Sequence, residues 1–451
     1  MEKKNRAILT SGNVKSILIE LTIPMIFGML GMIIFNLVDT YFVGKLGTNQ
    51  LAALTFTFPV VLIINSLAQG LGMGASSVIS RAIGEGDHHK VQRLATDSLS
   101  LSIILVIIFV IIGLSTIEPI FELLGVNADI MPYVKEYMSI WYIGVVFVVV
   151  PMVGNNAIRA LGDTKTPGIV MMVSATINVI LDPLLIFGVG PFPRLGVAGA
   201  AIATVIARAV TFIVALYILI IREKIVIVQS AKIEEVISSW KKILYIGLPN
   251  ALTKMINPIA MGIITSLVAS HGIEVVAGYG VATRLERFAL LLVGALSTIM
   301  APFIGQNYGA GRMDRVKLSI SLSEKFSLIS SGVIFLILAI FAKPIAGLFS
   351  NDSSVISVVA KYLWIVPIGY GVQGILLIST SALNALNKPI HASILTIIQM
   401  FGLYVPLALL GSHLFGIIGI FGSIVVSYLI SACISHYVVK KVLYNKKALD
   451  V

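Results

Sequence analysis

Three acidic side chains, Asp39, Asp182 and Glu286, lie within long apolar segments of the chain. An ionisable group in the middle of a membrane span costs at least ~2.5–3.5 kcal/mol to insert, so each of these residues suggests an ion pathway or a binding site. Asn178 precedes Asp182 by four residues, which places both side chains on one face of a helix. Asp39 and Asp182 come shortly before the ends of their segments, and Thr204 is about nine residues into the following one. At ~1.5 Å of rise per residue, all four of these polar side chains fall in the outer half of the membrane.

Two carboxylates, an amide oxygen and a hydroxyl form a set of hard oxygen ligands. Such a set suits a hard cation, and two carboxylates can also share a proton. We therefore predict that Asp39, Asn178, Asp182 and Thr204 bind a coupling ion, which is sodium or a proton. Four oxygen donors favour sodium, because a proton needs only one carboxylate. We expect no cofactor other than this ion.

Basic side chains also occur within apolar segments. Arg208 follows Thr204 by four residues. It would either favour ionisation of the acids and compete with a bound cation, or turn away and contact another group. Lys254, Arg284 and Arg287 accompany Glu286 in the second half of the chain. This group is either a salt-bridged cluster that neutralises Glu286, or a gate or site for a negatively charged group.

Candidate substrate-contacting residues come from both halves of the chain. Met25, Met29 and Met32 recur at i, i+4 and i+7, and flexible thioethers suit a pocket for varied apolar shapes, although ordinary packing explains them as well. The full predicted substrate cleft consists of Met25, Met29, Met32, Asn155, Asn156, Lys254 and Arg284.

The composition indicates that helices in a membrane position all of these residues. Of the 451 residues, 57% are hydrophobic and 12% are charged, which is about half the charge of a soluble domain. A single cysteine, Cys433, excludes a disulfide framework and a cysteine metal site. The net charge of +11 is scattered over short loops, which argues against a nucleic-acid partner. No phosphate-binding loop and no nucleophile–base pair are present, so we expect no ATP hydrolysis by this chain and no enzymatic activity.

We predict an all-α polytopic membrane protein with twelve transmembrane helices in two pseudo-symmetric six-helix bundles. The predicted spans are 17–42, 52–80, 94–116, 132–157, 168–188, 195–221, 243–268, 275–303, 318–341, 356–384, 390–411 and 416–438. With both termini in the cytoplasm, 23 of the 32 Lys and Arg residues lie on the cytoplasmic side and 5 on the opposite side. The predicted parts are an N-lobe at 1–221, a cytoplasmic linker at 222–242, a C-lobe at 243–438 and a cytoplasmic tail at 439–451.

The two halves form an internal repeat with an offset of 225 residues. Pro24 matches Pro249, Tyr137 matches Tyr362, and glycines in corresponding loops also match. Both halves start on the same side of the membrane, so the repeat is parallel, which is typical of transporters. Asp39 corresponds to Ile264, Asp182 to Tyr404 or Val405, and Thr204 to a position near Ile424. No acid occurs at these positions of the second copy, so we interpret the predicted ion site as a functional feature of the first half.

Several motifs together resemble the multidrug and toxic compound extrusion (MATE) family. They are the helix from Pro24 to Gly47, the pair Gly84-Glu85-Gly86 and Gly309-Ala310-Gly311, the loop from Arg159 to Pro167, the stretch from Asn178 to Pro183, and the stretch from Gly199 to Thr204. The resemblance covers nearly the whole chain and is strongest to the DinF-like and archaeal branch. It implies secondary active efflux of amphipathic, often cationic, organic compounds by sodium- or proton-coupled antiport. It also implies that Asp39, Asn178, Asp182 and Thr204 are the coupling residues.

The alternative functions are a lipid-linked saccharide flippase of the related superfamily and, less well supported, a gated pore. The sequence departs from the NorM-like branch of the MATE family, because the seventh and tenth predicted spans contain no acid. We expect small amphipathic molecules and the lipid bilayer as partners, and a monomer in the cell (inner) membrane that crosses it many times, with both termini cytoplasmic.

Overall fold

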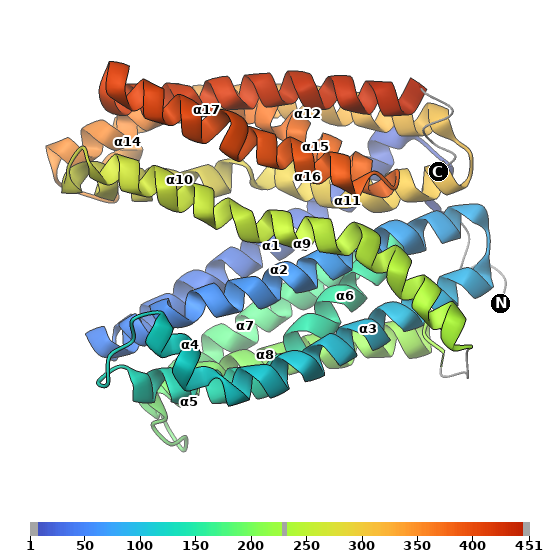
Figure 1. Cartoon of the computed structure of the whole chain (residues 1–451), viewed down its shortest axis with the longest axis horizontal. Coiled ribbons are helices and arrows are strands. Elements are labelled where there is room, and N and C mark those ends of the chain that lie inside the picture. Colours follow the sequence, from blue (N-terminus) through green and yellow to red (C-terminus); the bar gives the residue numbers. More distant parts are fainter. Residues whose placement is uncertain (1–7, 228–231, 445–451) are drawn as a thin grey trace. The chain divides into compact units, whose positions relative to one another are not determined.

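The computed structural model describes residues 8–227 and 232–444, and within these ranges all regular secondary structure is helical (Figure 1). The chain begins with η1 (Ile8–Thr10) and α1 (Val14–Gly44). The following helices are α2 (Thr48–Glu85), α3 (His88–Ser115), α4 (Ile117–Leu123), α5 (Met131–Gly144), α6 (Val146–Ala160), α7 (Lys165–Phe187), α8 (Gly196–Tyr217), η2 (Ile218–Arg222) and α9 (Ile233–Ala269). The second half contains α10 (Ile273–Ala289), α11 (Leu291–Gly309), α12 (Met313–Ile340), α13 (Ala342–Gly347), α14 (Ser353–Ile365), η3 (Val366–Gly369), α15 (Tyr370–Ala385), α16 (Pro389–Ile397), η4 (Ile398–Tyr404) and α17 (Val405–Tyr444).

The membrane spans agree with the predicted number when bent helices are taken into account. In the described residues, nine helices are long and apolar enough to cross a membrane, and two bent pairs raise this number to eleven. The bends are 42° between α5 and α6 and 48° between α10 and α11. The stretch Pro389–Tyr444 contains a further break at Gly416, whose φ of 61° and ψ of −140° are not helical. This break divides the stretch into two spans, which gives the predicted twelve.

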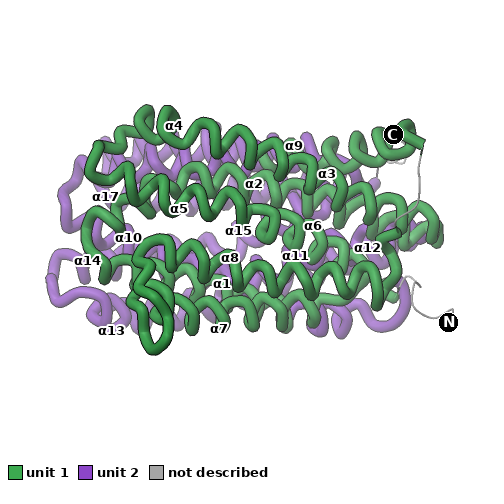
Figure 2. The backbone as a smooth tube through the Cα atoms, turned by 90° about the horizontal axis from the view of Figure 1, so that it is seen from below, with its two compact units in different colours: residues 1–9, 23–251 green, residues 10–22, 252–451 purple. Residues whose placement is uncertain are grey.

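The chain divides into two compact units (Figure 2). Unit 1 contains residues 23–251 and the N-terminal residues up to Leu9, and unit 2 contains residues 10–22 and 252–451. The boundary therefore falls inside α9, whereas the predicted domains were separated by the polar segment 222–242.

Close backbone contacts explain why the first part of α9 belongs to unit 1. A Cβ atom added at Gly70 would lie 2.4 Å from the carbonyl oxygen of Gly247, and one at Gly74 would lie 2.3 Å from that of Ile243. Only glycine allows α2 and α9 to approach this closely, because any side chain would collide with the opposite backbone.

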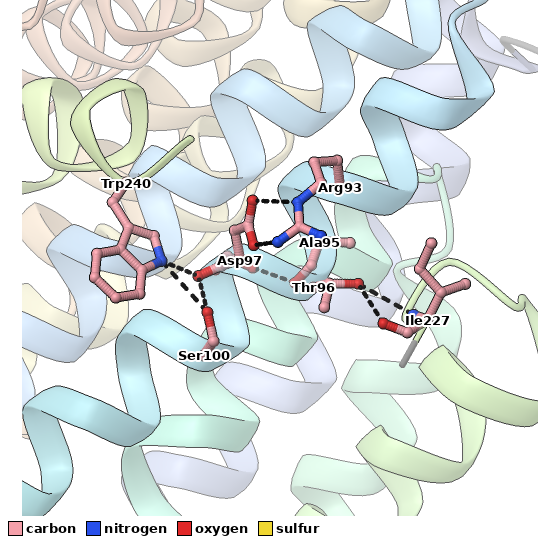
Figure 3. A network of polar contacts seen from close by, with 8 residues as sticks. Arg93, Ala95, Thr96, Asp97, Ser100, Ile227 and Trp240 are labelled. Carbon is pink, nitrogen blue, oxygen red and sulfur yellow. Dashed lines mark hydrogen bonds and ion pairs between the residues drawn. The ribbon is translucent and has the colours of Figure 1, made fainter. Parts of the chain in front are cut away.

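Polar contacts fasten the segment before α9 onto α3 (Figure 3). Arg93 and Asp97 form an ion pair on α3, and Trp240 of α9 donates its indole N–H to the backbone oxygen of Asp97 at 3.0 Å. The backbone N–H of Ile227 donates to the hydroxyl of Thr96 at 3.1 Å. Within the described part of the predicted linker, the chain is helical from Ile233 onward, and Ile227 and Trp240 contact the N-terminal half of α3.

Unit 2 is built around α15, which packs against α11, α12 and α17. The two halves of α17 fold back on each other at the Gly416 break, where a Cβ at Gly419 would lie 1.9 Å from the carbonyl oxygen of Gly411. Arg315 of α12 donates to the backbone oxygen of Gly12 at 2.7 Å, and this contact attaches the start of the chain to unit 2.

Candidate cation site in unit 1

Three of the four predicted ion ligands, all in unit 1, interact with one another in the structure. Asn178 and Asp182 lie on the same face of α7, and both are fully buried. The amide nitrogen of Asn178 donates to Oδ1 of Asp182 at 3.1 Å. Asp39, on α1, interacts electrostatically with Asp182. The sequence spacing predicted the shared face of α7, and the fold adds Asp39 from the first helix.

The site contains buried oxygen atoms that have no donor. Oδ1 of Asp39, Oδ1 of Asn178 and Oδ2 of Asp182 are all inaccessible to solvent and have no hydrogen-bond partner. Leaving a buried polar atom unpaired costs about 1–3 kcal/mol, and such atoms are rare in native proteins. All three atoms are acceptors, so each needs a hydrogen-bond donor or a cation as its partner.

Thr204 lies at the same level as these residues on the neighbouring helix. α7 and α8 run antiparallel: Gly199 packs against the backbone of Leu185, and Ser174 donates its hydroxyl to the backbone oxygen of Ala207 at 2.9 Å. Thr204 falls between these two contacts and is buried, which places it opposite the Asn178–Asp182 turn. Its membership of the ligand set stays a prediction.

Tyr137 also lies beside the candidate site, although the sequence did not predict it as a site residue. It is on α5, is buried, and interacts electrostatically with both Asp39 and Asp182. The only sequence signal was its match to Tyr362 across the repeat. A phenol in an apolar segment needs a polar partner when buried, and this requirement could have identified it.

Arg208 contacts an aromatic ring beside the site. Its guanidinium carbon lies 5.0 Å from the centre of the Phe35 ring, and Phe35 is one turn before Asp39 on α1. A cation over a ring face is a favourable arrangement where water is excluded. Of the two predicted alternatives, the structure matches the one in which Arg208 contacts another group.

α1 and α7 cross with their backbones in direct contact near Pro24, about four helical turns before Asp39 on α1. A Cβ at Gly168 would lie 2.6 Å from the carbonyl oxygen of Pro24, and a Cβ at Gly28 would lie 3.0 Å from Cα of Gly168. Pro24 cannot donate a backbone hydrogen bond to the preceding turn, which makes α1 easier to bend at this point. The helix that carries Asp39 therefore has a flexible position next to its contact with the helix that carries Asp182.

The predicted substrate-contacting residues are divided between the two units. In unit 1, Met25 is buried and its sulfur lies 4.0 Å from a guanidinium nitrogen of Arg159. Arg159 also donates to the side-chain oxygen of Asn156 at 2.6 Å, so these three side chains link α1 to α6. Asn155 is buried as well. The remaining predicted members are the partly buried Met29 and Met32 in unit 1 and the exposed Lys254 and Arg284 in unit 2.

Glu286 is bound by tyrosines, and this differs from the salt-bridged cluster that was one of its predicted alternatives. Tyr362 donates its hydroxyl to Oε2 of Glu286, and Tyr428 donates to Oε1 at 3.0 Å. The side chains of Arg284 and Arg287, also on α10, are exposed and do not form a buried ion pair with Glu286.

Comparison with known proteins identifies the family. The MatE family model matches residues 24–184 and 249–410, so it matches each half of the chain separately. The two matched segments start 225 residues apart, at Pro24 and Pro249, which confirms the internal repeat.

Individual relatives extend over nearly the full length. A protein of Shewanella oneidensis described as an FAD transporter is 39% identical over 445 residues, which is 99% of this chain and 98% of that protein. The multidrug export protein MepA of Staphylococcus aureus is 26% identical and covers 91% of this chain and 90% of its own length.

Solved structures show the same fold. The Vibrio cholerae MATE transporter VcmN in the bent form superimposes with a TM-score of 0.90 at 31% identity, covering 95% of this chain and 97% of that one. A MATE structure in the straight conformation gives a TM-score of 0.91 at 26% identity, with 100% and 99% coverage. Together with the twelve spans and the repeat, these matches show that the chain is a multi-pass membrane transporter that belongs to the MATE family.

Proposed function

We propose that this protein exports small amphipathic organic molecules in exchange for a cation that binds among Asp39, Asn178, Asp182 and Thr204. The observation that carries the proposal is the group of three buried, unpartnered oxygen atoms on α1 and α7. Efflux transport itself follows from the family. The coupling ion and the substrate are inferred from the residues.

Sodium is the cation that suits this set best. The Asn178 amide donates to one oxygen of Asp182, and this hydrogen bond leaves the Asn178 oxygen and the second Asp182 oxygen free to act as ligands. Asp39 adds a second carboxylate from another helix, and Thr204 adds a hydroxyl. A proton would satisfy one carboxylate and would leave the amide oxygen without a partner.

Binding of the ion is coupled to movement of α1. A cation attracted by both Asp39 and Asp182 draws α1 toward α7 at the outer end of the crossing, and the glycine contact at Gly168 acts as the pivot. Ion and substrate are exchanged if they favour different positions of α1, since a ligand shifts an equilibrium only by its differential affinity. Related MATE structures described as bent and as straight support this movement.

The substrate has two candidate classes. The multidrug exporters among the relatives support organic cations and other amphipathic compounds. The 39% identical FAD transporter supports an anionic dinucleotide. Lys254 and Arg284 favour the second class, because both carry an exposed positive charge deep in a span and a pyrophosphate is recognised by such groups.

Transport into proteoliposomes under separately imposed sodium and proton gradients tests the proposal. FAD and the fluorescent cation ethidium serve as the two substrates. Asp39→Asn should abolish gradient-driven transport, whereas the exposed Asp129→Asn should behave as wild type. Equal transport by both variants would show that the ion site is elsewhere. Lys254→Ala should reduce FAD transport specifically if the substrate is the dinucleotide.

The orientation belongs to the same proposal. We infer that both termini lie on the cytoplasmic side of the cell (inner) membrane, because the distribution of Lys and Arg favours that side. The charge distribution supports this orientation independently of the ion site.

A further inference from the structure

Glu286 is held inside unit 2 by side chains from two other helices. The hydroxyls of Tyr362, on α14, and Tyr428, on α17, each donate to a different oxygen of the Glu286 carboxylate. Glu286 itself is on α10. Both tyrosines belong to the buried core of the unit, and Tyr362 has no exposed surface. The partly buried carboxylate therefore connects three helices at the edge of a buried aromatic cluster.

Three more tyrosines surround this carboxylate. Tyr279, Tyr370 and Tyr404 interact electrostatically with Glu286 or with the tyrosines bound to it. They belong to the same buried cluster as Tyr362 and Tyr428. Tyr370 is fully buried and its hydroxyl has no hydrogen-bond partner. This hydroxyl is an unused polar group beside a carboxylate, which a packing role alone does not explain.

The internal repeat places this cluster where unit 1 has its ion site. Tyr362 corresponds to Tyr137, and Tyr404 corresponds to Asp182 within one residue. Ile264 and Ile424, the counterparts of Asp39 and Thr204, are members of the same buried cluster as Tyr362. The second copy has therefore lost the acids of the first and Ile264 takes the place of Asp39.

In unit 2 the carboxylate, that of Glu286, comes from a helix that supplies no acid to the site in unit 1. Glu286 corresponds to Val61 of α2, and Val61 packs against the cluster that contains Tyr137. In unit 1 this position is apolar and the acids come from α1 and α7. In unit 2 the position supplies the acid. The positions in unit 2 that correspond to the predicted ion ligands of unit 1 contain no acid, as expected. Glu286 nevertheless gives unit 2 a carboxylate from another position.

We propose that Glu286 is a second cation-binding site of this transporter and that its cation is a proton. A single carboxylate is sufficient for a proton, and both oxygens of Glu286 are already engaged by phenol donors.

The groups that face Glu286 are neutral, with one exception. Tyr362 comes from α14, Tyr370 from α15, Tyr404 from η4 and Tyr428 from α17. Arg287 is the next residue on α10 and interacts electrostatically with Glu286, but its own side chain is exposed. No second acid takes part in these contacts, so the proton is not shared between carboxylates as it can be at Asp39 and Asp182.

Protonation changes the hydrogen bonds between the helices. When one oxygen of Glu286 takes up a proton, that oxygen becomes a donor and accepts more weakly from the tyrosine hydroxyl bound to it. That tyrosine hydroxyl can then accept from Glu286 or donate its hydrogen to another group. The contacts of α10 with α14 and α17 thus depend on the protonation state, while the unit 1 site depends on its own ion.

Infrared difference spectroscopy of the purified, reconstituted protein tests this proposal without a transported substrate. Spectra are recorded as the pH is changed from about 9 to about 4, a range that includes documented values for buried carboxyls. Wild type should develop a carboxylic-acid C=O band that is missing in Glu286→Gln. The band should remain in Asp39→Asn, which alters the other site, and in Glu118→Gln, which alters an exposed glutamate.

Two further measurements identify the residue and the ion. Tyr428→Phe and Tyr362→Phe should each move the frequency of the band, because each removes a hydrogen bond to the carboxyl group; both remain informative if Glu286→Gln fails to fold. Sodium chloride added at fixed pH should leave the band unchanged. The proposal is overturned if Glu286→Gln has the same difference spectrum as wild type, if neither phenylalanine variant moves the band, or if sodium removes it.

Discussion

Replacing Gly168 by alanine tests the role of the α1–α7 crossing. The added Cβ would lie 2.6 Å from the carbonyl oxygen of Pro24, and ordinary contacts of a Cβ begin at 3.4 Å, so the two backbones must separate by about 0.8 Å. The obstructing atom belongs to the backbone and cannot turn away. Overpacking of this kind typically costs about 1–3 kcal/mol.

The separation should weaken cation binding, because Asp39 is on α1 and Asp182 is on α7. If the full cost falls on the ion-bound state, the half-saturating sodium concentration rises by about 5- to 150-fold. The assay is sodium-gradient-driven transport by proteoliposomes at fixed pH, measured over a series of sodium concentrations.

Gly332→Ala is the matched control, because Gly332 is also within a helix but a Cβ there would meet no atom within 4 Å. It should leave the sodium dependence unchanged. An unchanged or lower half-saturating concentration in Gly168→Ala, at normal expression, would refute the view that this crossing positions the two carboxylates.

Three other predictions concern the ion, the loop before α7 and the topology. Thr204→Val keeps the shape of the side chain and removes one oxygen ligand, so the half-saturating sodium concentration should rise while any proton-driven transport remains; no change would remove Thr204 from the ligand set. Burial opposes ionisation of Asp163, but hydrogen bonds from Thr166 and Arg222 outweigh it and lower the pKa of Asp163 below its usual value. The resulting stability is present above the unfolded pKa of about 4 and is lost as the pH falls through the folded pKa. Asp163→Asn should therefore lower thermal stability by about 1 kcal/mol at neutral pH, and its difference from wild type should disappear in acid; a difference independent of pH would contradict this. A cysteine introduced at Ser230, which lies outside the described residues, should be labelled only from the cytoplasmic side. Labelling from outside intact cells would show that the orientation is opposite to the predicted one.

Much of the fold follows from local features of the sequence. The apolar runs and the distribution of Lys and Arg predicted twelve spans, and the repeat of 225 residues predicted two equivalent halves. The bends between α5 and α6 and between α10 and α11 were not predicted, because glycine and apolar residues are common throughout membrane helices. The predicted gap between the spans 390–411 and 416–438 agrees with the break at Gly416. The unit boundary inside α9 depends on the Gly70 and Gly74 contacts, which connect residues far apart in the chain.

The candidate site was predicted from a shared helix face for two of its residues and from depth in the membrane for the other two. The i, i+4 spacing of Asn178 and Asp182 places both on one face of α7, and their hydrogen bond agrees with it. The proximity of Asp39 and Tyr137 depends on how α1 and α5 pack, which spacing does not show. Glu286 was associated with its neighbours in sequence, Arg284 and Arg287, whereas its hydrogen-bond partners Tyr362 and Tyr428 come from helices 76 and 142 residues away.

Direct binding of radioactive sodium to the purified protein at fixed pH tests the central claim, that the buried oxygens of Asp39, Asn178 and Asp182 hold the coupling cation. Wild type should show one saturable site. The site should be lost in Asp39→Asn and in Asp182→Asn and should be kept in Glu286→Gln. Saturable binding that survives both aspartate substitutions, or no saturable binding in a wild-type protein that transports its substrate in a sodium gradient, would contradict the claim.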